Sequence, residues 1–392
     1  MKTAIVNGRI LFPDRTVRDG YLELEGEKIL RAAPGAYSGD AERIVDAGSL
    51  YVSPGFIDMH THGAGGADFM DGTPEAFVTA AMEQMRHGTT TLTPTALTCP
   101  DEELEQAFAC CREARRRLAG KGPNLAGMHL EGPFFSAKQA GAQDPKYLQI
   151  PTKENIGRIL RHADEIYRVS AAVELPGSLE LGDELRKRGI LGAIGHSDAE
   201  YGQVCEAVRH GFSHVTHLYS GMSMLHRIGP YRHLGVVEAA YLLDGLTVEI
   251  IADGKHLPPE LLRLILKSKP MDSICLITDS MRGAGLPDGS IVKLGSLEKG
   301  QDVILEDGVA MLMDHTAFAG SVCTTDRCVR NMRDLAGVSL PDSVRMITEN
   351  PARILGLSGK GRLAPGMDAD ICLFDENVTI QAVFVMGKQL VG

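Results

Sequence analysis

The middle of the chain alternates between short apolar runs and longer amphipathic segments. Short runs rich in Val, Ile, Leu and Thr predict strands, and segments whose apolar residues recur three and four positions apart predict helices. The predicted strands are residues 55–60, 89–94, 125–130, 166–173, 191–195, 214–218, 247–251 and 273–278. The predicted helices are residues 75–87, 102–118, 155–162, 178–188, 199–210 and 259–267.

This alternation predicts an α/β fold in which eight strand–helix units close into a (β/α)8 TIM-type barrel. A barrel of this kind typically takes ~250 residues plus insertions, which suits the length of the alternating region. A doubly wound open sheet is the alternative. The Gly-rich turn that binds dinucleotides in such sheets is not found in the sequence, so the barrel is the better interpretation.

The two ends of the chain have a different pattern, with short strand-like runs broken by glycine. These runs are residues 3–11, 21–32, 370–374 and 380–386. We predict that they pair into one small β-sandwich-like domain, built from residues 1–53 plus 359–392. Residues 54–358 then form the barrel domain. A chain of 392 residues is long enough for two such units.

Composition narrows the class of ligand. The formal net charge is −11 and no block of basic residues occurs, which argues against nucleic acid or an anionic membrane as a partner and favours a small molecule. The N-terminus lacks signal-peptide features, and no apolar stretch is long enough to span a bilayer, so we expect a cytoplasmic protein. The eight cysteines lack C-x-x-C spacing, which indicates reduced thiols.

Metal-ligand residue types recur at the ends of the predicted strands. His60 and His62 lie one residue apart, so both side chains project to one face of an extended segment. Catalytic groups of such barrels gather at the C-terminal strand ends, and six ligand-type residues there predict a metal-dependent hydrolase. Taken singly, each has a plainer interpretation as a turn or capping residue. The six are His60, His62, Glu131, His196, His217 and Asp279.

The local contexts of these residues resemble the amidohydrolase superfamily and, within it, the N-acetylglucosamine-6-phosphate deacetylase family. The resemblance covers nearly the whole chain, and the EGPF and THLY segments are the most specific to the family. The segments that carry it are PGFIDMHTHG (54–63), HLEGPFF (129–135), GHSDA (195–199), THLY (216–219), IADGKH (251–256), ITDS (277–280), AGS (319–321) and NPAR (350–353).

The resemblance implies a divalent metal, with zinc as the first expectation and iron, manganese and cobalt as alternatives. Glu131, His196 and His217 would bind the principal metal, and His60 and His62 would supply a second position, giving one or two metals per subunit. Many binuclear amidohydrolases instead use a carboxylated lysine at the end of the fourth strand. No lysine stands there in this chain.

The implied reaction is removal of the N-acetyl group of N-acetylglucosamine-6-phosphate. Asp279 is expected to take a proton from the attacking water and to deliver it to the departing amine. The resemblance also implies a homodimer, in which an arginine reaches the neighbouring active site to bind the phosphate; Arg232 and His233 are expected to be solvated instead. The expected substrate-binding residues are Gln143, Ser220, Gly221, Arg227 and His256.

Two departures from the family leave the substrate open. Ser220-Gly221 stands where the family usually has Asn-Ala, and Gln143 stands where some relatives have a histidine. N-acetylgalactosamine-6-phosphate is therefore an alternative substrate, and another N-acyl amine, such as an N-acyl-D-amino acid, is a further one. A barrel that binds without catalysis is the alternative from a different class of function.

Overall fold

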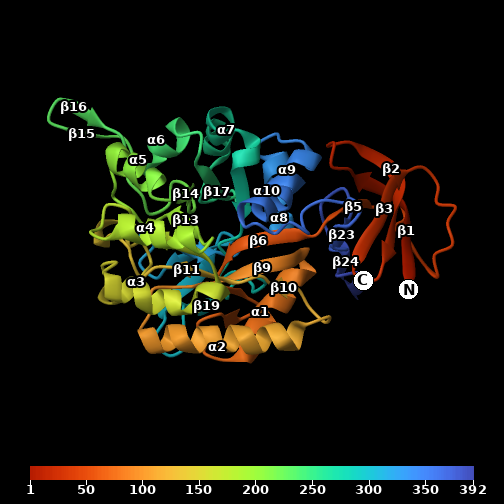
Figure 1. Cartoon of the computed structure of the whole chain (residues 1–392), viewed down its shortest axis with the longest axis horizontal. Helices are drawn as coiled ribbons and strands as arrows, with labels where there is room; N and C mark the ends of the chain where they lie inside the picture. Colours follow the sequence, from red (N-terminus) through yellow and green to blue (C-terminus); the bar gives the residue numbers. More distant parts are fainter.

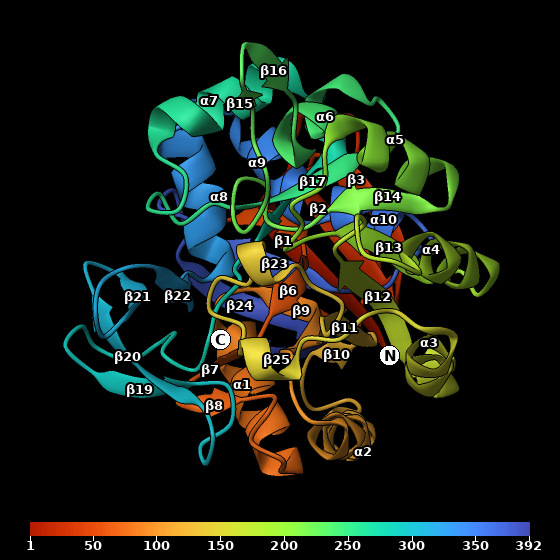
Figure 2. The same ribbon diagram turned by 90° about the vertical axis from the view of Figure 1, so that its left-hand side faces the viewer.

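The computed structural model describes residues 1–392, and a parallel β-barrel forms its centre (Figure 2). Two backbone hydrogen bonds between the end of the first barrel strand and the segment after the last one close the ring. Asp279 N–H donates to His60 O at 3.0 Å, and His62 N–H donates to Ser280 O at 2.8 Å. The predicted (β/α)8 fold is therefore confirmed. In order around the barrel, the strands are β6 (Phe56–Thr61), β9 (Thr89–Ala96), β11 (Met128–Glu131), β12 (Ile166–Ala171), β13 (Leu191–Ile194), β14 (Phe212–Val215), β17 (Thr247–Ile251) and β18 (Ile274–Ile277).

Helices surround the barrel, and their ends follow local sequence signals. Helix α1, for example, begins where Thr73 accepts a hydrogen bond from the Ala76 N–H and Pro74 occupies the first turn. No helix is both long and apolar enough to cross a membrane. The helices are α1 (Pro74–Arg86), α2 (Asp101–Leu118), α3 (Lys153–Ile159), α4 (Ser178–Lys187), α5 (Tyr201–Arg209), α6 (Val236–Leu242), α7 (Pro259–Ser268), α8 (Thr325–Asp334), α9 (Leu340–Ile347) and α10 (Glu349–Ile354).

The pattern of the sequence located the first five helices and α7 to within a few residues. It missed α6 and α8 to α10, which are short or carry few apolar residues. The predicted strand 125–130 divides into β10 (Asn124–Leu125) and β11, and β10 pairs only with β9. These differences concern element ends and short elements, where tertiary packing outweighs local preference.

The two ends of the chain form one separate sheet beside the barrel (Figure 1). β5 and β23 pair antiparallel, with Ser53 opposite Cys372, and this pairing joins the N-terminal flank to the C-terminal flank. The predicted small β domain built from both ends is thus present, whereas its exact limits stay a prediction. The strands are β1 (Lys2–Leu11), β2 (Val17–Glu25), β3 (Lys28–Pro34), β4 (Arg43–Asp46), β5 (Tyr51–Pro54), β23 (Ile371–Phe374), β24 (Ile380–Val385) and β25 (Lys388–Val391).

Two insertions extend the C-terminal side of the barrel, and the sequence pattern predicted neither. A hairpin of β15 (His226–Ile228) and β16 (Tyr231–His233) follows β14 and projects away from the small β domain (Figure 1). A four-stranded antiparallel sheet follows β18. Its strands are β19 (Ile291–Leu294), β20 (Gln301–Glu306), β21 (Val309–Leu312) and β22 (Phe318–Ser321).

A buried ion pair crosses the inside of the barrel. Arg168 on β12 donates to both carboxylate oxygens of Glu249 on β17, at 2.7 Å for the Nη2–Oε1 contact, and both side chains are fully buried. Arg168 also donates to the Thr216 hydroxyl at 2.8 Å and to the Met59 carbonyl on β6 at 3.3 Å. Each charge is therefore hydrogen-bonded as well as paired, which a buried ion pair requires.

Replacing Arg168 with leucine leaves the Glu249 carboxylate buried without its partner. We expect Arg168→Leu to lower the free energy of unfolding by about 3–5 kcal/mol. Urea denaturation followed by circular dichroism measures the change. The matched control is Arg209→Leu, whose exposed pair with Glu206 on the surface of α5 contributes less than about 1 kcal/mol. Equal midpoints for both variants would contradict the stabilising role of the buried pair.

Candidate metal centre

Six buried ligand-type side chains meet at the C-terminal rim of the barrel. They come from β6 and the residue that follows it, from the last residue of β11 and from the turns that follow β13, β14 and β18. In each of two groups of three, the potential ligand atoms all lie within 4.8 Å of one another. The first group is His60, His62 and Asp279, and the second is Glu131, His196 and His217.

The second group is the tighter of the two. Oε1 of Glu131 lies 3.1 Å from Nε2 of His196 and 2.9 Å from Nε2 of His217, and the two Nε2 atoms lie 3.2 Å apart. Two imidazole nitrogens and one carboxylate oxygen therefore converge on a single point. Two histidines and a glutamate are also the protein ligands of one well-known type of catalytic zinc site.

Glu131 connects the two groups. Its second oxygen, Oε2, lies 3.3 Å from Nε2 of His62, which in turn lies 3.2 Å from Oδ1 of Asp279. Gln143 donates to the same Oε2 at 2.9 Å and accepts a hydrogen bond from the Thr98 N–H at 2.9 Å. One carboxylate with an oxygen toward each group suits a bridge between two cation positions.

Partners outside the centre orient two of the imidazoles. Nδ1 of His196 donates to the Gln139 carbonyl at 2.8 Å, and Nδ1 of His60 donates to Glu249 at 2.7 Å. In the neutral ring each Nε2 then presents its lone pair to the centre, and Nε2 of His60 has no hydrogen-bond partner there. Facing lone pairs next to a carboxylate are stabilised by a cation, so these residues fit a divalent metal.

The centre is strongly polarised. Burial disfavours the charged form of His60, but the nearby carboxylates, Asp279 first, outweigh it and raise the pKa of His60 to about 9 when no metal is bound, so the centre attracts a positive charge, either a proton or a metal ion. Burial likewise opposes ionisation of Asp279, but the charges of His60 and His62 hold the pKa of Asp279 below its usual value. The same balance keeps the pKa of Glu131 well below its usual value. Both carboxylates are therefore ionised at neutral pH.

The backbone is strained at three of these residues. His196, His217 and Asp279 have φ angles of 46°, 24° and 47°, in the left-handed region that non-glycine residues rarely adopt. Such strain costs about 1–3 kcal/mol per residue and clusters at functional sites. The strained turns re-aim each side chain from the strand end into the barrel mouth.

A cavity of about 230 Å³ opens above the centre. Four of the five predicted substrate-binding residues line it, and they are Gln143, Ser220, Gly221 and His256. His256 is held by a 2.7 Å hydrogen bond from its Nδ1 to Asp253. The lining contains no lysine or arginine. Arg227 lies instead on the exposed hairpin β15–β16, so this chain does not bring it to its own cavity.

The departure at position 221 has a steric reason. Gly221 has a φ of 56°, and a Cβ there would lie 2.8 Å from Nδ1 of His196 and 3.1 Å from the Gln139 carbonyl. A side chain would therefore press on the hydrogen bond that orients His196. The other departure, Gln143, contacts the Glu131 ligand directly, so in this structure it supports the metal centre as well as lining the cavity.

Sequence reasoning missed Glu249 and Asp253, which hold His60 and His256 in place. A signal existed for both. Glu249 is the lone charged residue within the predicted strand 247–251, and Asp253 lies in the IADGKH segment already singled out. Neither residue lines the cavity, so both act by holding other residues of the site.

Comparison with known proteins agrees with this geometry. Residues 51–390 match the sequence profile of the amidohydrolase family. The chain is 33% identical to the N-acetylglucosamine-6-phosphate deacetylase of Lysinibacillus sphaericus, over 92% of this chain and 90% of that protein. It is 31% identical to the N-acetylgalactosamine-6-phosphate deacetylase of Escherichia coli O157:H7, over 86% of this chain and 87% of that protein.

A solved structure supports the same relationship. An aspartate-to-alanine variant of N-acetyl-D-glucosamine-6-phosphate deacetylase from Mycobacterium smegmatis, in complex with N-acetyl-D-glucosamine-6-phosphate, superposes with a TM-score of 0.89 at 30% identity. The match covers 100% of this chain and 99% of that chain. With its two groups of metal-ligand residues at the barrel mouth, the chain belongs to the amidohydrolase family, among the N-acetylglucosamine-6-phosphate deacetylases.

Proposed function

We propose that this enzyme hydrolyses N-acetylglucosamine-6-phosphate to glucosamine-6-phosphate and acetate. The observation that carries the proposal is the convergence of Glu131, His196 and His217 beneath a cavity that also contains Asp279. The relatives named for this activity cover nearly the whole chain. The E. coli relative makes N-acetylgalactosamine-6-phosphate the second candidate substrate.

We propose that Glu131, His196 and His217 hold a divalent metal, zinc in the first place, with iron, manganese or cobalt as alternatives. His60 and His62 would hold a second ion, with Glu131 shared between the two positions. A bound divalent cation supplies Lewis-acid catalysis, making water more acidic and polarising the acyl carbonyl. His, Glu and Asp ligands accept several of these metals, so availability contributes to the choice.

Asp279 is the proposed proton carrier. Its carboxylate lies 3.2 Å from Nε2 of His62, at the wall of the cavity, where its ionised form can accept a proton. It would take a proton from the attacking water as the acyl carbon gains its new C–O bond. It would then give that proton to the amine nitrogen as the C–N bond breaks.

The phosphate anchor is proposed to include a second subunit. His256 and the backbone N–H groups near Ser220 and Gly221 can contact a phosphate, but the cavity offers no arginine or lysine to balance a dianion. Arg227 is exposed on a hairpin that projects from the barrel (Figure 1). The hairpin also exposes Ile228 and Tyr231, at 53% and 73%, which a partner would cover. We infer a homodimer in which Arg227 reaches the neighbouring cavity.

Two further proposals concern the whole chain. We place the enzyme in the cytoplasm, because its eight cysteines are all unpaired, which is typical of proteins from a reducing compartment. We also propose the division into a catalytic domain of residues 54–358 and a small β domain of residues 1–53 plus 359–392. The pairing of β5 with β23 supports that division.

The direct test of the function is acetate release by zinc-loaded protein. We expect turnover of N-acetylglucosamine-6-phosphate, with the highest kcat/KM among three compounds assayed in parallel. The other two are N-acetylgalactosamine-6-phosphate and unphosphorylated N-acetylglucosamine. A preference for the galacto sugar would assign the second candidate, and equal rates with and without phosphate would contradict the proposed anchor. No acetate from any of the three would contradict the function.

Loss of the proton carrier should slow hydrolysis of the amide without releasing the metal. We expect Asp279→Asn to lower kcat by roughly 10²–10⁴-fold, the usual contribution of general acid–base catalysis. Elemental analysis should show that the metal at Glu131, His196 and His217 is retained. Asp244→Asn, at an exposed position outside the cavity, is the control and should keep wild-type kcat. An Asp279→Asn protein with full metal and full turnover would refute the mechanism.

Subunit mixing tests the position of Arg227. Arg227→Ala should raise KM for the phosphorylated sugar by roughly 10- to 100-fold, the loss of one charge-assisted contact. When it is refolded together with Asp279→Asn, activity should recover, because one site of each mixed dimer receives an intact Arg227 and keeps its own Asp279. Arg232→Ala, on the same hairpin, should need no rescue. No recovery on mixing would place Arg227 outside the neighbouring site.

A further inference from the structure

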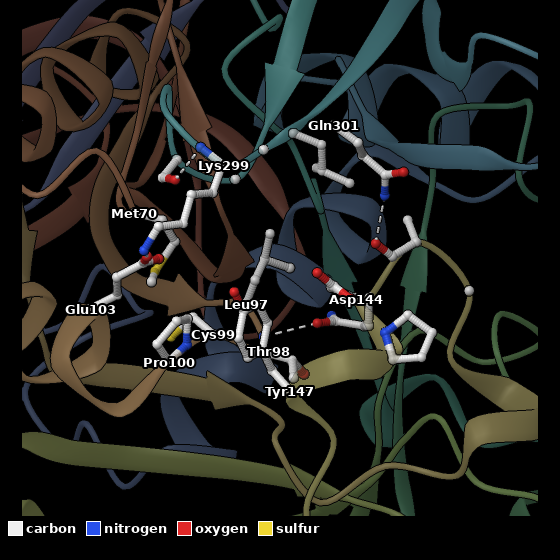
Figure 3. A pocket seen from close by; sticks show the side chains of 18 of the residues that line it. Met70, Leu97, Thr98, Cys99, Pro100, Glu103, Asp144, Tyr147, Lys299 and Gln301 are labelled. Carbon is white, nitrogen blue, oxygen red and sulfur yellow. Dashed lines mark hydrogen bonds and ion pairs between the residues drawn. The ribbon is translucent and has the colours of Figure 1, made fainter.

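A second pocket of about 290 Å³ adjoins the catalytic cavity (Figure 3). It lies between the turn after β9, the loop at residues 141–147 and the inserted sheet β19–β22. Five residues line both spaces, so little else separates them. The shared residues are Leu97, Gly141, Ala142, Gln143 and Leu294.

Two contacts hold the inserted sheet over this pocket. Lys299 forms an ion pair with Glu103 at the start of α2, and Gln301 donates to the Ala142 carbonyl at 2.9 Å. Figure 3 shows Lys299 and Gln301 in the upper part of the view, with Leu97 and Thr98 below them near its middle. Apart from Gln143, the residues that the pocket shares with the catalytic cavity are non-polar, and its remaining lining includes the polar residues Glu103, Lys299 and Gln301. Its one lysine is already paired, so it lacks a free cation for an anionic ligand.

The lining of the catalytic cavity is of two kinds. Ser220, Gly221 and His256 suit the sugar phosphate, whereas Leu97, Ala142 and Leu294, which the second pocket shares, suit an apolar group. The acyl carbonyl must sit at the metal centre, next to Glu131 and Gln143. The acyl substituent is then the part of the substrate nearest the shared apolar residues. Beyond them lies the second pocket rather than packed core.

We propose that the second pocket is an acyl-chain subsite, which lets the enzyme hydrolyse hexosamine-6-phosphates whose N-acyl group is longer than acetyl. The inference rests on the proposed function and adds the substrate class. The reaction is unchanged: water adds its hydroxyl to the acyl carbon, the C–N bond breaks, and the amine takes the proton. The products are glucosamine-6-phosphate and the corresponding longer carboxylate.

The test compares N-acetyl-, N-propionyl- and N-butyryl-glucosamine-6-phosphate with the metal-loaded enzyme. A closed acyl site rejects each extra methylene by roughly tenfold or more, which would amount to about 100-fold for butyryl. We expect instead that kcat/KM for the butyryl substrate stays above roughly one tenth of the acetyl value. A larger fall overturns the proposal. Failure to hydrolyse the acetyl substrate would instead overturn the proposed function.

Variants that fill the pocket locate the acyl chain. Leu312→Trp occupies the pocket from the inserted sheet, so it should lower the butyryl-to-acetyl ratio by roughly tenfold or more and leave acetyl turnover unchanged. Met313→Trp is the matched control, because Met313 is its chain neighbour, is 48% exposed and does not line the pocket. Ser296→Trp fills the pocket from a partly exposed turn and replaces Leu312→Trp if that variant misfolds. An unchanged ratio in the filled variant places the chain elsewhere and overturns the proposal.

Discussion

The ion pair between Arg168 and Glu249 links the stability of the barrel to the geometry of its metal centre. The same Glu249 carboxylate accepts hydrogen bonds from Nδ1 of His60 and from the His217 N–H. Arg168 holds that carboxylate through two of its nitrogens and also donates to Thr216, the residue before His217. Arg168 therefore fixes a single buried carboxylate, Glu249, and that carboxylate holds one ligand of each metal-binding group, His60 and His217. An apolar barrel interior would pack as well, but it could not orient these imidazoles.

Glu131 likewise connects the two groups of metal-ligand residues. It ends β11, so its side chain projects from the barrel rim, and its two oxygens face different groups of ligands. Gln143 supports one oxygen and comes from a loop rather than a strand. The barrel thus holds the metal-ligand residues, whereas loops and insertions shape the space around them. This separation explains how the cavity and the adjoining pocket can set substrate range without changing the metal ligands.

The insertions show where sequence patterns lose their predictive value. The six metal-ligand candidates stood out because they lie at the ends of regular elements whose period is visible in the chain. The inserted sheet and the projecting hairpin have short strands, exposed apolar residues such as Ile291 and Tyr231, and many turns. Short strands of this kind are specified by pairing with neighbours rather than by their own pattern. The second pocket could not be predicted from the sequence for the same reason, since one of its walls is the inserted sheet.

The sequence by itself determined the alternation of strands and helices, the small β domain from both chain ends and the residue types at the strand ends. Those features are local, because a period of two or of 3.6 residues and a ligand after a strand are visible in a short window. Only the tertiary structure decided that His60 and Glu249, 189 residues apart, share a hydrogen bond. It also decided that Arg227 lies outside the cavity of its own chain. Such contacts depend on how the barrel closes, and closure is a property of the whole chain.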